Sequence, residues 1–424
     1  MPPRRPTQLI SALCLASLGF LSLAAQAADP LNLTVTVGSE TVSAGYSDWE
    51  LFFNAMDNDG LKNLVPTYND TQAAAIKLDL RGLVMNASYP NANQADFVLS
   101  IPAIGFNETI TNTQASGDRD KASDLMQERL ESSDVLSKIT KALAASSPVD
   151  PVAGNPNSLM STMVSNDFNL SFGAEISNIA APSDVAKPAS AAGSENKASN
   201  FVGVGIEYGQ MSQGNIDVKS TTLPLSYTIR NDLDPRRQLM LRLPITVIDT
   251  GGAKTLQAGF GAAYRVPMSA NWSLTPSLNY ALVGSVDLLA AAQMATAGVT
   301  STYFWRKEGY DVGMGNMIGY ATTLPFTYDD KKFDPGIANT VFRNGVMVSI
   351  PTRVFGGKMH FETALVDTRF FGTDLYSDNQ QELKFTIGTT RSASTAKSSL
   401  FRAGVSYVKT PNDDGFKVEL GYWF

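Results

Sequence analysis

The chain has 424 residues, with 40 acidic side chains against 33 lysines and arginines and a formal net charge of −7. An acidic chain of this kind is a poor candidate for binding nucleic acid, because the phosphate backbone attracts basic surfaces. The single cysteine excludes an intramolecular disulfide. Beyond the N-terminus no stretch is apolar enough to predict a membrane-spanning helix.

The first 27 residues predict a secretory signal peptide. Two arginines precede an apolar run over residues 9–23, and Ala25, Gln26 and Ala27 form a small-x-small cleavage site. A transmembrane anchor is the alternative, but the run is too short for a helix that spans a bilayer. Cleavage removes Cys14, two positive charges and no acidic side chain, so −7 becomes −9. We therefore expect an exported, cysteine-free protein that is stabilised by packing and hydrogen bonds.

Residues 28–115 predict a small β-rich periplasmic unit. Apolar and polar residues alternate over residues 31–37, 76–80 and 97–101, as they do in half-buried strands. Residues 49–56 fit a short helix. A docking module and a purely structural domain both fit this pattern.

Residues 116–179 predict a helical segment that is a candidate plug for a barrel. A first helix would end before residues 132–134, which could cap a second helix. A third helix would follow Asn157. Residues 168–176 also fit an additional strand, because Phe168, Leu170 and Phe172 alternate. Residues 180–200 have the composition of a flexible linker. The plug-packing side of the third helix is expected to consist of Leu159, Met160, Met163 and Val164.

From residue 201 to Phe424 the alternation recurs about twelve times, in runs long enough for tilted membrane strands. In the clearest run Trp272, Leu278 and Tyr280 face one way and Ser273 faces the other. An open sheet would leave unpaired backbone groups in lipid, so the strands should close. We therefore predict an all-β membrane fold, an antiparallel outer-membrane β-barrel. The expected strands are residues 201–209, 217–230, 237–249, 254–266, 271–284, 293–306, 309–322, 338–350, 358–370, 380–391, 398–408 and 414–424.

The last strand, residues 416–424, should pair with residues 201–209. An even number of strands brings both ends of the barrel to one side, which is the periplasm for an exported chain. Trp272, Trp305 and Trp423 fall at that end, where tryptophan favours the membrane interface. We expect a Gram-negative outer-membrane protein with a periplasmic N-terminal region. Its expected partners are outer-membrane lipid and the outer-membrane assembly machinery, which would recognise the C-terminal strand.

Ten charged residues are expected on the inner face of the barrel. Charges facing hydrocarbon cost several kcal/mol, whereas charges in a wet lumen cost little. They form either a salt-bridged filling or the basic lining of a conduit. Inward-facing glycines such as Gly315 and Gly345 would leave room and favour the conduit, and twelve strands suit a narrow or helix-filled pore. The predicted pore-lining residues are Glu207, Arg230, Arg242, Arg265, Arg343, Glu362, Lys384, Arg402, Lys417 and Glu419.

Catalysis is not expected. The only histidine is His360, near Lys358 and Glu362 at the expected periplasmic end of its strand. Barrel hydrolases that rely on one histidine would place it at the outer rim, so His360 is a poor candidate for a general base. No metal-ligand spacing, phosphate-binding loop or redox motif is present. We predict no catalytic residue, no metal and no cofactor.

Several phrases resemble a known family. Residues 223–237 (LPLSYTIRNDLDPRR) are similar to the start of the barrel in the outer-membrane pore of the functional-amyloid (Fap) export system. Residues 271–278, 342–345, 374–378 and 421–424 also resemble that family. The resemblance implies a trimeric, twelve-stranded barrel that is plugged by a helix and passes unfolded amyloid subunits. The family has an N-terminal coiled coil, whereas this chain is β-rich there. Solitary autotransporter-like barrels are the second family by general appearance.

Two functions follow as hypotheses. The first is a gated conduit for a secreted polypeptide, such as an amyloid subunit. The second is a non-conducting surface or structural barrel that binds a partner through its loops or its N-terminal unit.

Overall fold

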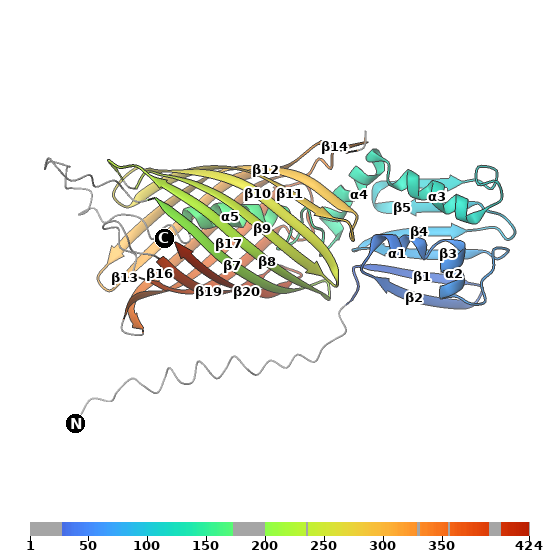
Figure 1. Cartoon of the computed structure of the whole chain (residues 1–424), viewed down its shortest axis with the longest axis horizontal. Coiled ribbons are helices and arrows are strands. Elements are labelled where there is room, and N and C mark those ends of the chain that lie inside the picture. The colour runs from blue at the N-terminus through green and yellow to red at the C-terminus, as the bar shows by residue number, and fades with distance from the viewer. Residues whose placement is uncertain are drawn as a thin grey trace, which may run out of the picture.

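The computed structural model describes residues 28–172, 200–234, 236–328, 331–354, 357–389 and 400–423. The expected signal peptide, nearly all of the expected linker and residues 173–176 of the possible extra strand lie outside these residues. A small α+β unit sits against one end of a barrel, and a helix inside the barrel continues from it (Figure 1). No described helix is long and apolar enough to cross a membrane.

The N-terminal unit is built on an antiparallel sheet. Apolar side chains on alternate positions, such as Leu31, Leu33 and Val35 in the first strand, are buried. This is the burial pattern expected of strands with one covered face. In the spatial order β2-β1-β3-β4-β5-β6, the strands are β1 (Leu31–Val37), β2 (Glu40–Tyr46), β3 (Ala74–Leu80), β4 (Leu83–Tyr89), β5 (Phe97–Ile101) and β6 (Phe106–Ile110).

Helices cover one face of this sheet, and their buried residues join those of the strands in a single core. Asp48, Asp57 and Asp118 precede three of them and accept backbone N–H groups of the first turn, which stabilises the helix starts. The helices are α1 (Trp49–Asn54), α2 (Asn58–Leu64), α3 (Arg119–Leu130) and α4 (Ser133–Ser146), with a 3-10 turn, η1 (Pro102–Ile104).

The barrel closes with twelve antiparallel strands, as the sequence predicts. In the closing pair, Trp423 lies opposite Gly203 and Asp414 lies opposite Ser212. Going round the barrel, the strands are β7 (Phe201–Gln213), β8 (Ile216–Arg230), β9 (Gln238–Thr250), β10 (Ala253–Pro267), β11 (Trp272–Ser285), β12 (Ala290–Lys307), β13 (Tyr310–Leu324), β16 (Ala338–Val354), β17 (Gly357–Gly372), β18 (Asn379–Thr389), β19 (Leu400–Lys409) and β20 (Asp414–Trp423).

The connection between β13 and β16 has structure of its own. Residues 325–339 contain a separate hairpin of β14 (Phe326–Tyr328) and β15 (Lys331–Phe333), in which the Phe326 and Phe333 rings stack with centroids 5.1 Å apart. This hairpin reaches back beside α4, where the backbone N–H of Asp334 donates to the Ser137 hydroxyl over 3.0 Å.

The outer face of the barrel is apolar. On β11, Leu278 is 64% exposed, while its neighbour Asn279 is 6% exposed and points inward. Val418 and Leu420 on β20 are also exposed, and comparable residues recur on every strand of the barrel wall. A continuous apolar band on the outer face is the arrangement that a lipid bilayer requires of a barrel.

Candidate functional site: the helix-filled lumen

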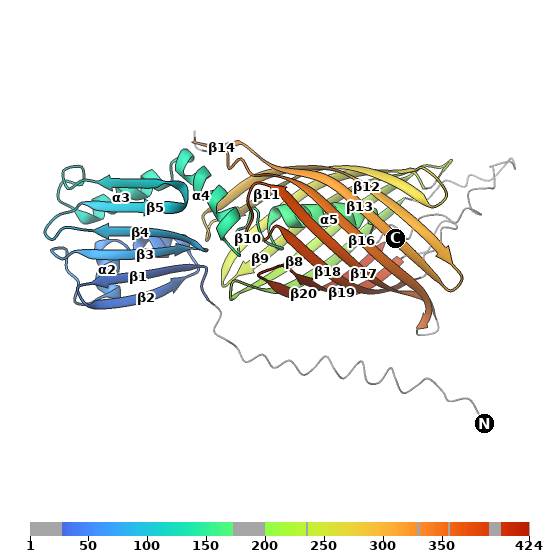
Figure 2. The ribbon, with the colours of Figure 1, turned by 180° about the vertical axis from the view of Figure 1, so that it is seen from behind.

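The chain enters the lumen from the end opposite the barrel's own termini. Phe201 and Trp423 lie at one end, here called the terminal end. The N-terminal unit meets the other end, here called the capped end, which is formed by residues 214–215, 251–252, 286–289, 373–378 and 410–413. The N–H of Ala28 donates to the carbonyl of Asn215 over 3.1 Å there, and both views show the unit at this end (Figures 1 and 2).

A periplasmic N-terminal unit and periplasmic barrel termini were both expected. They cannot both hold, because the described structure places them at opposite ends of the barrel. The connection between the two ends runs through the lumen as α5 (Leu159–Phe172).

Residues 147–158 close the capped end. Asp150 forms a buried ion pair with Arg81, from the β3–β4 turn, at 3.3 Å. The other carboxylate oxygen of Asp150 accepts the N–H groups of Val152 and Ala153. The barrel loops complete the seal, since the N–H of Ser377 donates to the carbonyl of Gly154 over 2.9 Å. The N-terminal unit is therefore docked on the barrel by buried charge and backbone hydrogen bonds.

Asp413 belongs to the same end. It lies in the β19–β20 turn, and its Oδ1 accepts the N–H of Gly214 over 3.1 Å. Burial raises the pKa of Asp413 to about 6, against the opposing effect of this hydrogen bond. A proton therefore binds and leaves this turn near neutral pH.

The apolar side of α5 is embedded in the barrel. Leu159, Met160, Met163 and Val164 are all buried there. They share a cluster with inward-facing apolar residues of the wall, which include Ala281, Val283, Met294, Met317, Ala321 and Val341. Part of the lumen is thus apolar, contrary to the expectation of a polar inner face, because it forms a core with the helix.

Phe168 and Phe172 belong to the same helix and not to an additional strand. Their rings lie 5.0 Å apart, as residues four apart on a helix do. Both rings rest on glycines of β13 and β16. A Cβ on Gly315 would lie 2.5 Å from the Phe172 ring, and one on Gly345 would lie 3.0 Å from the Phe168 ring. These two glycines therefore hold the helix, whereas the sequence suggested that they leave the pore open.

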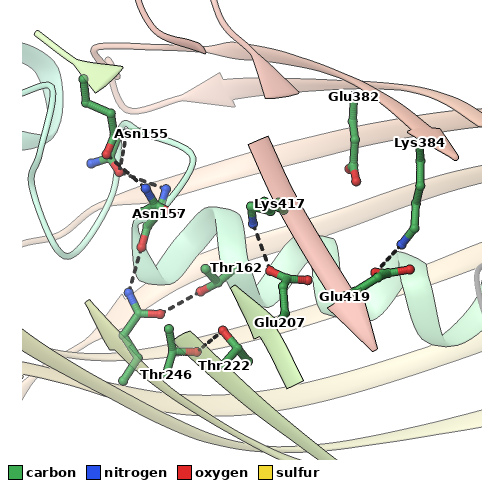
Figure 3. Close-up of polar contacts among 12 residues, drawn as sticks. Asn155, Asn157, Thr162, Glu207, Thr222, Thr246, Glu382, Lys384, Lys417 and Glu419 are labelled. Atoms are coloured by element: carbon green, nitrogen blue, oxygen red, sulfur yellow. Dashed lines mark hydrogen bonds and ion pairs between the residues drawn. The ribbon is translucent and has the colours of Figure 1, made fainter. Parts of the chain in front are cut away.

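The polar side of α5 carries one acidic residue, Asp167, which is 3% exposed. Its carboxylate forms an ion pair with Arg242 and accepts hydrogen bonds from Asn279 Nδ2 at 2.6 Å and from Thr296 Oγ1 at 3.1 Å. One turn earlier, the Thr162 hydroxyl donates to Gln257 over 3.0 Å. Figure 3 shows the Thr162 contact beside the helix.

Further polar contacts fix the two ends of the helix. Before it, Gln257 Nε2 donates to the carbonyl of Asn157 over 2.9 Å, and Asn157 Nδ2 donates to Gln213 over 3.1 Å. At its last turn, Arg265 Nη2 donates to the carbonyl of Ser171 over 3.2 Å.

The wall from β16 through β20 to β7 carries paired charges. Lys384 meets Glu419 at 2.5 Å and Lys417 meets Glu207 at 3.3 Å, as Figure 3 shows. Arg343 meets Glu382 at 2.8 Å, and Arg402 pairs with Glu362. Four cations thus balance four anions, so this wall is a salt-bridged surface, which is one of the two arrangements that the sequence left open. Of the remaining expected residues, Arg230 lies near the terminal end, with its guanidinium 4.6 Å from the Phe201 ring centre.

A cavity of about 190 Å³ separates α5 from this charged wall. Asn166, Asn169 and Phe172 line its helix side, and the wall contributes Glu207, Lys384, Arg402 and Glu419. The lumen is therefore tightly packed on one side of the helix and hollow on the other.

Two groups of contacts were missed by the sequence reasoning. Glu382 could have been found, because it lies two residues from Lys384 on the same strand and so faces the same way. Asp167 and its partners Asn279 and Thr296 come from separate elements, and nothing in their local sequence indicated that they meet.

His360 also has neighbours that the sequence did not suggest. Its Nδ1 lies 3.0 Å from the Ser349 hydroxyl, which also lies 3.3 Å from Glu362. Ser349 is 5% exposed and its backbone belongs to the β16–β17 ladder. The absence of catalysis stays a prediction.

The architecture is that of an outer-membrane-type β-barrel with a helix in its lumen. Similar solved structures include the β-domain of the Bordetella autotransporter BrkA, with a TM-score of 0.43, 14% identity, and coverage of 54% of this chain and 99% of that domain. The translocator domain of the autotransporter NalP from Neisseria meningitidis gives 0.37 and 10%, with coverage of 54% and 90%. An outer-membrane channel from Pseudomonas putida F1 gives 0.38 and 10%, with coverage of 55% and 98%. None of these three covers the whole chain. No protein family and no curated protein matches the sequence.

Proposed function

We propose that this protein is a Gram-negative outer-membrane barrel that displays its own N-terminal unit on the cell surface. The observation that carries the proposal is the separation of ends: the barrel begins and finishes at the terminal end, and residues 28–158 lie at the capped end. If the terminal end faces the periplasm, as Trp272, Trp305 and Trp423 and the C-terminal strand suggest, the N-terminal unit faces outward.

The contacts of α5 support a helix that stays in the lumen and so holds the N-terminal unit on the barrel; this helix is called the tether below. The helix buries apolar side chains against an apolar part of the wall, and each fully buried side chain of this size contributes about 1.5–3 kcal/mol. An empty lumen would expose that apolar wall to water. A cysteine-free exported chain also suits passage through a barrel in an unfolded state.

Cysteine labelling of intact cells tests the orientation. Leu51 in the N-terminal unit is 62% exposed, and Leu233 in the β8–β9 turn at the terminal end is 91% exposed. We expect a membrane-impermeant maleimide to label Leu51→Cys in intact cells. Leu233→Cys should react only after the outer membrane is permeabilised. The opposite pattern would place the N-terminal unit in the periplasm and refute surface display.

A gated conduit for a secreted polypeptide, such as an amyloid subunit, is the second candidate. The cavity beside α5 is the observation that favours it. On its other side α5 packs against the apolar wall, so an extended polypeptide would have to share the lumen with the helix. Passage of a polypeptide therefore requires α5 to leave the lumen, and this can be measured as conductance.

A further inference from the structure

The partners of Asp167 form one row across the barrel wall. Gly261 on β10 is the direct neighbour of Arg242 on β9 and of Asn279 on β11, and Asn279 is the direct neighbour of Thr296 on β12. These four residues are called the receptor row below. Three consecutive strand pairings thus bring an arginine, an amide and a hydroxyl to one level of the lumen.

The receptor row is organised by its own contacts. Arg242 Nε donates to Asn279 Oδ1 over 3.2 Å, and Asn279 Nδ2 donates to Thr296 Oγ1 over 2.9 Å. Gly261 permits this convergence, since a Cβ there would lie 2.0 Å from Asn279 Oδ1 and 2.6 Å from Arg242 Nε. The wall therefore positions these donors without help from the helix.

The donors match a carboxylate. Both oxygens of Asp167 are bound, one by Arg242 and Asn279 and the other by Asn279 and Thr296. Arg242 Nη1 is buried and has no hydrogen-bond partner among the described residues, so the row has one donor to spare. A buried cluster of a guanidinium, an amide and a hydroxyl recognises an anion with two acceptor oxygens.

We propose that the receptor row is a carboxylate-binding site of the barrel wall, which Asp167 occupies in the folded protein and which fixes the position of α5 along the lumen. The inference deepens the proposed display, because it names the group that retains the tether. Once the aspartate side chain is removed, the same site takes a small carboxylate from solution, such as formate.

Chemical rescue of the full-length protein in detergent micelles tests the site. Asp167→Ala should lower Tm by about 5 °C or more, because a buried guanidinium loses its counter-charge. Sodium formate, exchanged for sodium chloride at constant ionic strength, should restore part of that loss in a saturable manner. Wild-type protein, whose site is filled, should show no formate-specific shift.

The double variant Asp167→Ala/Arg242→Met is the matched control, and formate should not restore its Tm. The proposal is overturned if formate acts no better than chloride on Asp167→Ala, or if it acts equally on the double variant.

If Asp167→Ala does not fold into the barrel, a double-mutant cycle of Asp167→Asn and Arg242→Met takes the place of the formate experiment. The Tm losses of Asp167→Asn and Arg242→Met should then combine to less than their sum, and strictly additive losses would refute the site. Neither result depends on which side of the membrane residues 28–158 face. Failure of the labelling experiment and failure of the carboxylate site are therefore distinguishable.

Discussion

Gly315 and Gly345 lie directly opposite each other on β13 and β16, and together they form the surface on which the rings of Phe168 and Phe172 rest. Neither position has room for a methyl group unless α5 moves. The position of the helix therefore depends on these two glycines of the wall. The sequence alone suggested that they leave the lumen open.

Gly315→Ala should push the Phe172 ring away and destabilise the helix-filled barrel by about 1–3 kcal/mol, as overpacking of a core does. Thermal unfolding in micelles measures the effect. Gly319→Ala is the control on the same strand, because its Cβ would meet its nearest neighbour at an ordinary 3.4 Å. An equal loss of stability in both variants would show that strand propensity, and not contact with Phe172, sets the cost.

The pH dependence of the capped end should follow Asp413. Its folded-state pKa of about 6 lies above the ordinary value for an aspartate, so the folded form binds the proton more tightly than the unfolded form. This contribution to stability is therefore fully present at low pH and is lost as pH rises through about 6. Wild-type Tm relative to Asp413→Asn should fall between pH 5 and pH 7.5. A rise over that interval would contradict the pKa.

Arg81 and Asp150 should be the strongest single tie between the N-terminal unit and the segment that closes the barrel. Both side chains are almost fully buried, so Arg81→Asn leaves the Asp150 carboxylate uncompensated at a cost of about 3–5 kcal/mol. Asn also tolerates the backbone at this position, where φ is 55°. The loss should therefore reflect the charge and not the turn.

Hydrogen exchange at Val152 and Ala153 reports this tie, since Asp150 accepts both N–H groups. Exchange at both amides should accelerate in Arg81→Asn. Lys77→Met, on the exposed face of β3, is the control and should change stability by less than about 0.5 kcal/mol. Unchanged exchange in Arg81→Asn would mean that the other contacts at the capped end hold the segment unaided.

The barrel was predictable because its rule is local. Alternation along β11 identifies Leu278 as the residue that faces lipid and Asn279 as the residue that faces inward. Closure of the barrel follows from the cost of unpaired backbone groups in a membrane. The contents of the lumen were less accessible. Phe168 and Phe172 fit a strand and a helix equally well, since a spacing of four residues serves both periods.

No single segment of the sequence predicts the end of the barrel at which the N-terminal unit lies. It depends on the end at which residues 147–158 meet the barrel, and therefore on contacts such as that between Gly154 and Ser377, which are over 200 residues apart in the chain. The role of the inner glycines likewise depends on a distant segment, because the rings that rest on Gly315 and Gly345 belong to α5. Patterns along the chain predict elements, whereas contacts between distant residues decide how the elements are combined.

Conductance across planar bilayers distinguishes a fixed tether from a gate. With α5 anchored and residues 147–158 closing the capped end, the full-length protein should carry little current. Asp167→Ala removes an anchor of about 3 kcal/mol, which corresponds to a rise on the order of 100-fold in the population with the helix released. We expect long, large openings in this variant.

Asn169→Ala is the control, because Asn169 lines the cavity on the same helix and its loss removes no contact with the receptor row. It should leave the small current nearly unchanged. Large spontaneous openings in the wild-type protein would instead favour the gated conduit, because they would show that α5 leaves the lumen without loss of its anchor.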